Sequence, residues 1–504
     1  MTGVRAFEAR ERTVSTQSSS APSIRSNYRS RSAYCVALIV IFVLTLPLIN
    51  PWVRGDGVGY YAFARSMLIE HKLDFHEDWL RANSSFRMAH LGPDGEVAPT
   101  MYTATGHLDN HFSIGPAILW APFLVVAHAG VLMADGVGAH IVPDGFSRPY
   151  IVAISLGTAF YGFLAVVLSF AVARRLVAER WAFLAAAGIW FGSSLPVYMY
   201  FNPSWSHAQS AFVVALFVWY WVRTRGARSA GQWAIWGAMG GLMVDVYYVN
   251  AVLLLFAIFE SLESYSVSLR RRDLTSARRL LMSNVIFSAA LLAAFLPTLI
   301  AKKVIYGGFL QMGYGHLWNL WSPALFKALF SSDHGLLSWT PILIASIAGL
   351  CLTLRLDRKL GLYSVVVFAA FLYTIGCYLD WDGLSSFGNR FFVSLTPLFI
   401  IGLAVVLDVM ARAFPPRRVT VVSTGAVAIL VLWNLGLIFQ WGMHLIPPRG
   451  PISWRDAAYN QAEVVPREAA TAMKAYFTRR SILMQGIERT DVNALKSQAG
   501  RIAE

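Results

Sequence analysis

The apolar run AYCVALIVIFVLTLPLINPW (33–52) is followed almost directly by the glycine-rich stretch RGDGVGYYAFAR (54–65). A helix that crosses about 30 Å of hydrocarbon needs roughly 20 mostly apolar residues, and the first run meets this requirement. We expect a membrane anchor rather than a cleaved signal sequence, because the run is long and no small-residue cleavage site follows it. The glycine-rich stretch then places an aspartate, Asp56, at the membrane boundary.

Comparable apolar runs recur along the whole chain. They lie at 33–52, 113–133, 150–173, 181–200, 207–222, 232–259, 282–301, 335–354, 361–379, 392–411 and 419–445. Apolar residues make up 56% of the 504 residues and charged residues only 14%, against about 25% in a soluble domain. This composition excludes a disordered chain and predicts an all-α polytopic membrane protein.

The charge pattern predicts the orientation in the membrane. The formal net charge is +14, which in a soluble protein would suggest nucleic acid as a partner. Here the basic residues gather in short loops between apolar runs, as expected on the cytoplasmic side of a membrane. They lie at Arg174–Arg175–Arg180, Arg223–Arg225–Arg228, Arg270–Arg272 with Arg278–Arg279, Arg355–Arg358–Lys359, and Arg412–Arg417–Arg418. The surplus therefore reflects orientation, and no nucleic acid is expected.

Two runs cannot be single crossings in this scheme. The run at 232–259 lies between two basic loops, so we expect two short helices with a break near Asp245–Tyr248. The run at 113–133 has external loops on both sides, which indicates an interfacial or re-entrant helix. The result is about 11 transmembrane helices, with a cytoplasmic N-terminus and an external C-terminus.

This scheme divides the chain into three parts. Residues 1–32 form a disordered basic cytoplasmic tail, and residues 33–445 form the transmembrane domain with a large first external loop at 53–149. Residues 446–504 form an external tail, which we expect to be a lid of one or two surface helices.

Polar side chains suited to chemistry gather in the loops predicted to be external. Four short stretches would open on that face: HLDNHFSIGP (107–116), NPSWSHA (202–208), SSDHGLLSWTP (331–341) and DWDGLSSFGNRFF (380–392). Together they predict a pocket at the lipid–water boundary. Arg390 is suited to binding phosphate, although an interfacial arginine or a partner of Asp380 or Asp382 remains an alternative. Asp56 is either a functional carboxylate or the N-cap of the following helix.

The order of these segments resembles the GT-C superfamily of membrane glycosyltransferases, which includes protein O-mannosyltransferases and aminoarabinose transferases. GDGVGYYAFARSML (55–68) is similar to the first-loop pattern of that superfamily. The stretches NHFSIGPAILWAPF (110–123), PSWSHA (203–208), SSDHGLLSWTP (331–341) and SFGNRFFVSLTP (386–397) resemble a mostly uncharacterised bacterial subgroup. The resemblance covers roughly 35–445 and implies a GT-C-like helical bundle with interfacial helices in the first external loop. It also implies a bacterial inner membrane, so that the external C-terminus would be periplasmic.

The resemblance implies an inverting transfer of a sugar from a polyprenyl-phosphate donor to a hydroxyl of a lipid or glycan acceptor at the external face. Asp56 would be the catalytic base, and Arg390 would offset the charge on the leaving phosphate. The candidate substrate-binding residues are Tyr60, Tyr61, His111, His207, His334, Asp382, Asn389 and Arg390. No cofactor is implied, and a divalent metal ion is compatible with the pattern but not indicated by it. A flippase or transporter of a lipid-linked sugar, or a non-catalytic scaffold for envelope assembly, remains an alternative.

Overall fold

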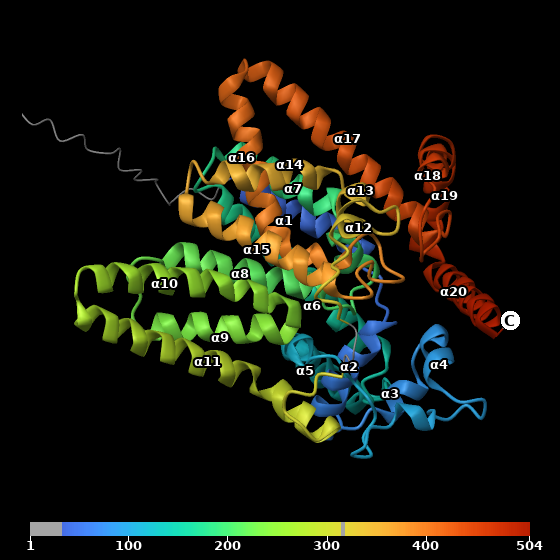
Figure 1. The fold of residues 1–504 in the computed structure, drawn as a ribbon. Coiled ribbons are helices and arrows are strands. Elements are labelled where there is room, and N and C mark those ends of the chain that lie inside the picture. Colours follow the sequence, from blue (N-terminus) through green and yellow to red (C-terminus); the bar gives the residue numbers. More distant parts are fainter. Residues whose placement is uncertain (1–32, 314–317, 504) are drawn as a thin grey trace, which may run out of the picture.

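The chain folds into a bundle of helices (Figure 1). The computed structural model describes residues 33–313 and 318–503, so the predicted tail at 1–32 lies outside the described residues. Within the described ranges there is no strand, only the isolated bridges Leu91–Val97, Tyr102–Leu108 and Trp318–Tyr378. The predicted all-α class is confirmed.

The bundle is built from helices that follow the apolar runs. They are α1 (Ala33–Thr45), η1 (Leu46–Leu48), α6 (Arg148–Ala173), α7 (Glu179–Gly192), η3 (Val197–Phe201), α8 (His207–Thr224), α9 (Ala230–Val246), η4 (Tyr248–Leu254), α10 (Leu255–Arg270), α11 (Leu274–Tyr306), α12 (Leu325–Phe330), α13 (Leu336–Trp339), α14 (Ile342–Thr353), α15 (Arg358–Cys377), η5 (Arg390–Leu395), α16 (Thr396–Ala413) and α17 (Pro416–Gly442). By length and composition, 7 helical segments of the described chain, α5 (Gly115–Gly136) among them, could cross a membrane. The protein is a multi-pass membrane protein, and the total of 11 crossings stays a prediction.

The predicted break in the run at 232–259 is present. Helix α9 begins with a capping box between Ser229 and Gln232 and ends at Val246. Tyr247 is extended, with φ −157° and ψ 115°, and the 3₁₀ turn η4 then leads into α10. The run therefore forms two helices, as predicted.

Glycines bring the bundle helices into close contact. A Cβ atom on Gly237 or Gly241 of α9 would lie 2.1 or 2.2 Å from a backbone oxygen of α11. Because two glycines four residues apart remove side chains from one face of a helix, the two backbones can approach closely. Gly349 of α14 and Gly402 of α16 permit the same approach, and a Cβ on Gly349 would lie 1.9 Å from the carbonyl oxygen of Gly402.

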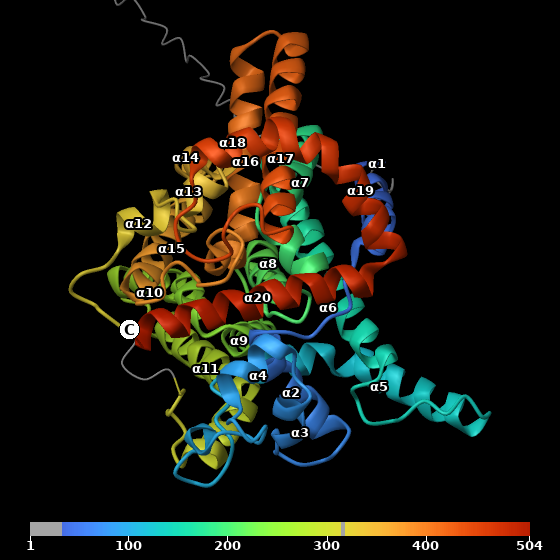
Figure 2. The same ribbon diagram turned by 90° about the vertical axis from the view of Figure 1, so that its right-hand side faces the viewer.

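The segment that connects α1 to α6 forms a separate layer at one end of the bundle. It contains α2 (Asp56–Leu68), α3 (His76–Leu80), α4 (Ser84–His90), η2 (Pro99–Met101) and α5. Helices α8 to α11 run across the view of Figure 1, whereas α5 is seen nearly end-on there and extends sideways in Figure 2. The interfacial or re-entrant position of α5 stays a prediction, because its length and composition also suit a membrane span.

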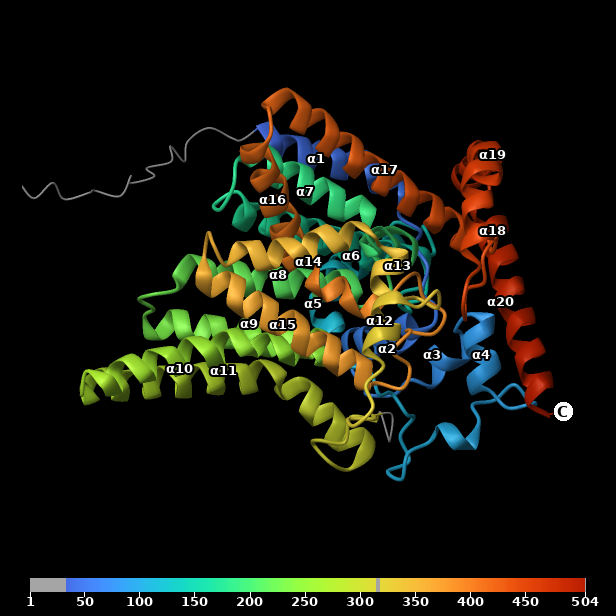
Figure 3. The ribbon, with the colours of Figure 1, turned by 45° about the horizontal axis from the view of Figure 1, so that its top comes forward.

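The C-terminal helices lie over the same end of the bundle. They are α18 (Trp454–Tyr459), η6 (Asn460–Val464), α19 (Val465–Thr478) and α20 (Arg480–Ala503). Figure 2 shows α20 crossing in front of the bundle, and Figure 3 shows it beside α4. Helix α20 thus lies against α4, in the layer that contains α2 to α4.

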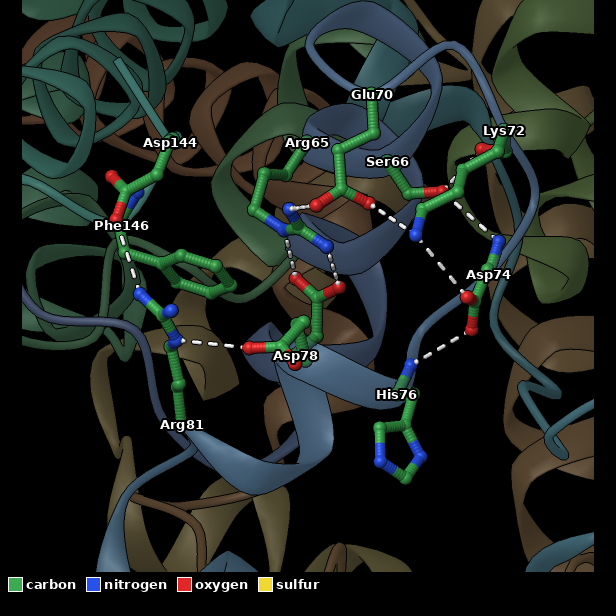
Figure 4. A network of polar contacts seen from close by, with 12 residues as sticks. Arg65, Ser66, Glu70, Lys72, Asp74, His76, Asp78, Arg81, Asp144 and Phe146 are labelled. Carbon is green, nitrogen blue, oxygen red and sulfur yellow. Dashed lines mark hydrogen bonds and ion pairs between the residues drawn. The ribbon is translucent and has the colours of Figure 1, made fainter. Parts of the chain in front are cut away.

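A buried ion pair holds the layer of α2 to α4 together (Figure 4). Arg65 donates from Nε and Nη2 to the two carboxylate oxygens of Asp78 at 2.7 and 2.6 Å, and from Nη1 to Glu70 at 2.6 Å. The side chains of Arg65 and Asp78 are only 1% and 3% exposed, and the Phe146 ring lies 4.4 Å from the guanidinium carbon. This arrangement fixes α3 against α2, whose first residue is Asp56.

We expect Asp78→Asn to destabilise the protein by about 3–5 kcal/mol, because it weakens the pairing of a guanidinium that stays buried. The measurement is the melting temperature in detergent. Glu77→Gln is the matched control, since Glu77 pairs with Arg81 on the exposed side of the same helix and such pairs contribute less than about 1 kcal/mol. Equal melting temperatures for the two variants would contradict the stabilising role of the buried pair.

Candidate active site

Asp56 is the first residue of α2 and points away from its own helix. Gly55 occupies the N-cap position with φ +52°, a left-handed conformation that favours glycine. The carboxylate of Asp56 accepts a hydrogen bond from Arg390 instead of capping the helix. The N-cap interpretation of Asp56 therefore does not hold.

The neighbouring glycines serve packing inside the protein. A Cβ atom on Gly57 would lie 2.1 Å from the hydroxyl oxygen of Ser204, and one on Gly59 would lie 2.1 Å from the Phe112 ring. The start of α2 is thereby pressed between two other segments that the sequence analysis marked, 107–116 and 202–208. The glycine-rich stretch thus positions Asp56 against the bundle.

Arg390 forms the centre of the site with Asp56. Its Nη1 lies 2.6 Å from Asp56 Oδ2, and the two side chains are 10% and 33% exposed. The guanidinium carbon lies 4.5 Å from the centre of the Trp205 ring, an arrangement that holds the guanidinium plane. Its Nε atom is buried and has no hydrogen-bond partner among the described residues. The arginine is therefore anchored on one side and has donor capacity left.

The pair lies in the wall of a cavity of about 1390 Å³. Tyr60, His111 and His207 line the same cavity, so the structure brings together five of the residues that the sequence predicted. Ser206 donates to the hydroxyl of Tyr60 at 3.0 Å. Burial lowers the pKa of the His111 imidazole, which is therefore neutral at pH 7.

Most of the remaining cavity wall is apolar. Helix α17 contributes Leu432, Leu435 and Phe439, α19 contributes Ala469 and Met473, and α20 contributes Ile487. The residues of α19 and α20 come from the C-terminal segment that lies across the end of the bundle, and those of α17 come from the bundle itself. The cavity therefore combines the Asp56–Arg390 pair and a few further charged side chains (Arg54, Asp380, Arg449 and Asp491) with a long apolar surface.

Four predicted residues lie outside this cavity. Tyr61 donates from its hydroxyl to the carbonyl of Gly145 at 2.5 Å and packs within the layer of α2 to α5. Asn389 is buried and donates to the carbonyl of Trp381 at 2.9 Å. His334 and Asp382 lie together behind the loop that carries Arg390, with His334 Nδ1 3.2 Å from the carbonyl oxygen of Asp382.

The residues that close the cavity were not predicted from the sequence. Asp491 of α20 forms an ion pair with Arg54 and lies 3.0 Å from His444 Nε2. Glu488, one turn earlier, accepts from Asn83 Nδ2 at 2.8 Å and from the backbone of Ser85 at 2.6 Å. Burial raises the pKa of Asp491, but His444 and Arg54 together hold it below its ordinary value, so this carboxylate is ionised at neutral pH. The polar composition of α20 was the available signal, and it did not reveal these partners.

No protein-family model and no curated protein matches the chain. Among solved structures, the chain is similar to ArnT from Cupriavidus metallidurans bound to undecaprenyl phosphate, with a TM-score of 0.49 and 14% sequence identity. That comparison covers 81% of this chain and 70% of ArnT. The apo structure of the same ArnT gives a TM-score of 0.45 and 15% identity over the same shares of both chains.

We expect Asp491→Asn to loosen α20 over the cavity. Losing one or two kcal/mol at a partly buried ion pair corresponds to a factor of about 5–30 in the population of the detached helix. Hydrogen exchange of the amides between residues 483 and 493 should quicken by that factor. Arg489→Gln changes an exposed residue of the same helix and serves as the control. Equal exchange in both variants would show that Asp491 does not hold the helix.

Proposed function

We propose that the protein transfers a sugar from a polyprenyl-phosphate donor to an acceptor hydroxyl in this cavity, at the external face of the membrane. The observation that supports this proposal best is the Asp56–Arg390 pair in a cavity whose wall is otherwise mostly apolar. A long apolar chain with an anionic head has the complementary chemistry. A carboxylate beside the head supplies the base that sugar transfer requires.

The donor would be held at both ends. Its polyprenyl chain would lie against α17, α19 and α20, where burial of apolar surface contributes roughly 25 cal/mol per Å². Its phosphate would be bound by Arg390, whose guanidinium lies in the cavity wall against the Trp205 ring. One guanidinium can thus contact Asp56 through Nη1 and the phosphate through its other donors.

The chemistry follows from these positions. Asp56 would take the proton of the acceptor hydroxyl while the hydroxyl oxygen attacks the anomeric carbon of the donor. The bond from that carbon to the phosphate oxygen breaks, and its electron pair stays on the phosphate. Attack from the face opposite the phosphate inverts the anomeric carbon. Since the leaving phosphate gains a negative charge, Arg390 binds the transition state more strongly than the donor.

The other cavity residues would hold the sugar. Tyr60, His111 and His207 line the cavity and carry hydrogen-bonding groups. The Nδ1 atom of His207 is buried and has no hydrogen-bond partner among the described residues. A sugar hydroxyl would supply the missing partner.

We expect Asp56→Asn to reduce sugar transfer by about 10² to 10⁴-fold, because the proton acceptor is lost. The test is complementation of a deletion strain, with mass spectrometry of the envelope glycans and of the lipid-linked donor. The variant strain should lack the sugar that the wild type adds and should accumulate the donor. Glycans equal to those of the wild type, at equal protein level, would refute the catalytic role.

Binding assays separate this role from that of Arg390. Purified Asp56→Asn protein should still bind undecaprenyl phosphate, whereas Arg390→Gln should bind it about tenfold or more weakly because a charge-assisted contact is lost. Asp94→Asn, which removes an exposed carboxylate of the same external loop, is the control for both assays. Unaltered lipid binding by Arg390→Gln would contradict the phosphate-binding role.

We expect Ala469→Trp to block the apolar part of the cavity, because a bulky ring would replace a methyl group in its wall. The variant should bind undecaprenyl phosphate at least about tenfold more weakly, a loss of roughly 1.4 kcal/mol. Ala470→Trp is the matched control, since Ala470 is the next residue of α19, is exposed and does not line the cavity. Equal affinities of the two variants would place the lipid chain elsewhere.

A further inference from the structure

A second polar cluster lies outside the cavity, behind the loop that leads to Arg390. Asp333, His334 and Asp382 each offer one potential ligand atom, and these atoms all lie within 4.8 Å of one another. They come from two segments of the chain, the turn before α13 and the loop after α15. Neither carboxylate forms an ion pair with a lysine or arginine in the described ranges.

His334 is held in a strained backbone conformation. Its backbone has φ +57°, an uncommon conformation for a residue with a side chain, and the residue is completely buried. The imidazole packs against the Trp339 ring, with the ring centres 4.9 Å apart. Its Nδ1 atom lies 3.6 Å from Asp333 Oδ1. The histidine is therefore locked toward a carboxylate that is its neighbour in the chain.

Two buried polar atoms of the cluster have no hydrogen-bond partner among the described residues. They are Asp333 Oδ1 and His334 Nε2. A buried polar atom without a partner costs roughly 1–3 kcal/mol, so such atoms usually bind a ligand, an ion or water. Two carboxylates and one imidazole form a donor set of oxygen and nitrogen atoms, as in many zinc and manganese sites.

We propose that Asp333, His334 and Asp382 bind one divalent transition-metal ion of the Zn²⁺ or Mn²⁺ type. The ion would join the turn at 331–334 to the loop at 380–390. The segment after α17 meets the same turn, because the backbone of Ile452 donates to the carbonyl of Ser332 at 3.3 Å. The metal would thus join two connecting segments at a point where a third also packs.

The consequence for the site lies in the loop that the ion would fix. That loop begins next to Asp382 and ends at Arg390, and it is closed by the bond from Asn389 Nδ2 to the carbonyl of Trp381. Gly383 packs against Arg390 with φ +75°, and a Cβ there would lie 3.1 Å from Arg390 Cγ. Asp333, His334 and Asp382 are positioning residues for Arg390 in this proposal, and metal binding itself does not depend on sugar transfer.

The test uses full-length protein purified in detergent without a polyhistidine tag and stripped with EDTA. Titration calorimetry and elemental analysis with ZnCl₂ and MnCl₂ should show about one ion per chain for at least one metal. Asp382→Asn and Asp333→Asn should each lower the affinity by about 10–100-fold. Asp94→Asn, with its carboxylate exposed in another loop, should bind as the wild type does.

Two results would overturn the proposal. One is that the wild-type protein binds neither metal when each is titrated to 100 μM. A dissociation constant of that size corresponds to a binding free energy of about 5.5 kcal/mol. The other is full affinity in both aspartate variants, which both keep His334 and therefore its packing. Hydrogen exchange of residues 380–390 tests the positioning role, since the metal should slow it in the wild type and leave it unchanged in Asp382→Asn. Faster or equal exchange with bound metal would refute that role.

Discussion

The pairing of Asp56 with Arg390 is the interaction on which the candidate site depends. It joins residues 334 positions apart in the chain, at the junction between the apolar bundle and the layer of α2 to α5. Removing two charges from water is costly, and the attraction between them repays the cost only when their hydrogen bonds are complete. Here they are incomplete, because Arg390 Nε has no partner among the described residues. The protein keeps a charged pair that still has capacity to bind, which is the property expected of a site for an anion.

The sequence predicted the helical class and the break near Asp245–Tyr248 because the membrane imposes a strict rule on the chain. Backbone polar groups have no water partners in hydrocarbon, so apolar runs become helices and polar interruptions become breaks. Helix ends followed other rules. The run at 33–52 stops being α-helical at Thr45, because Pro47 cannot continue the helix and the Thr45 hydroxyl bonds back to Ile41. Apolar content alone could not reveal this.

The sequence predicted several residues of the site, but it did not predict which of them contact one another. Asp56 and Arg390 were found separately, and the candidate partners of Arg390 were Asp380 and Asp382, its neighbours in sequence. Distance along the chain hid the actual partner. Tyr60 and Tyr61 show a second limit, since adjacent residues of a helix point about 100° apart and only one of them can face the cavity. Tyr60 faces it and Tyr61 packs on Gly145.

The cover over the cavity links binding to the charged pair. Arg54, which forms an ion pair with Asp491 of α20, lies two residues before Asp56. The same turn therefore carries both the residue that binds α20 and the carboxylate of the site. A lipid chain between α17, α19 and α20 would fill the space under the cover and favour its closed position. Closure excludes water, and in a drier site the charge on Arg390 acts more strongly on a phosphate. The apolar walls would then contribute to catalysis as well as to affinity, because they stabilise the state in which the charged pair is shielded.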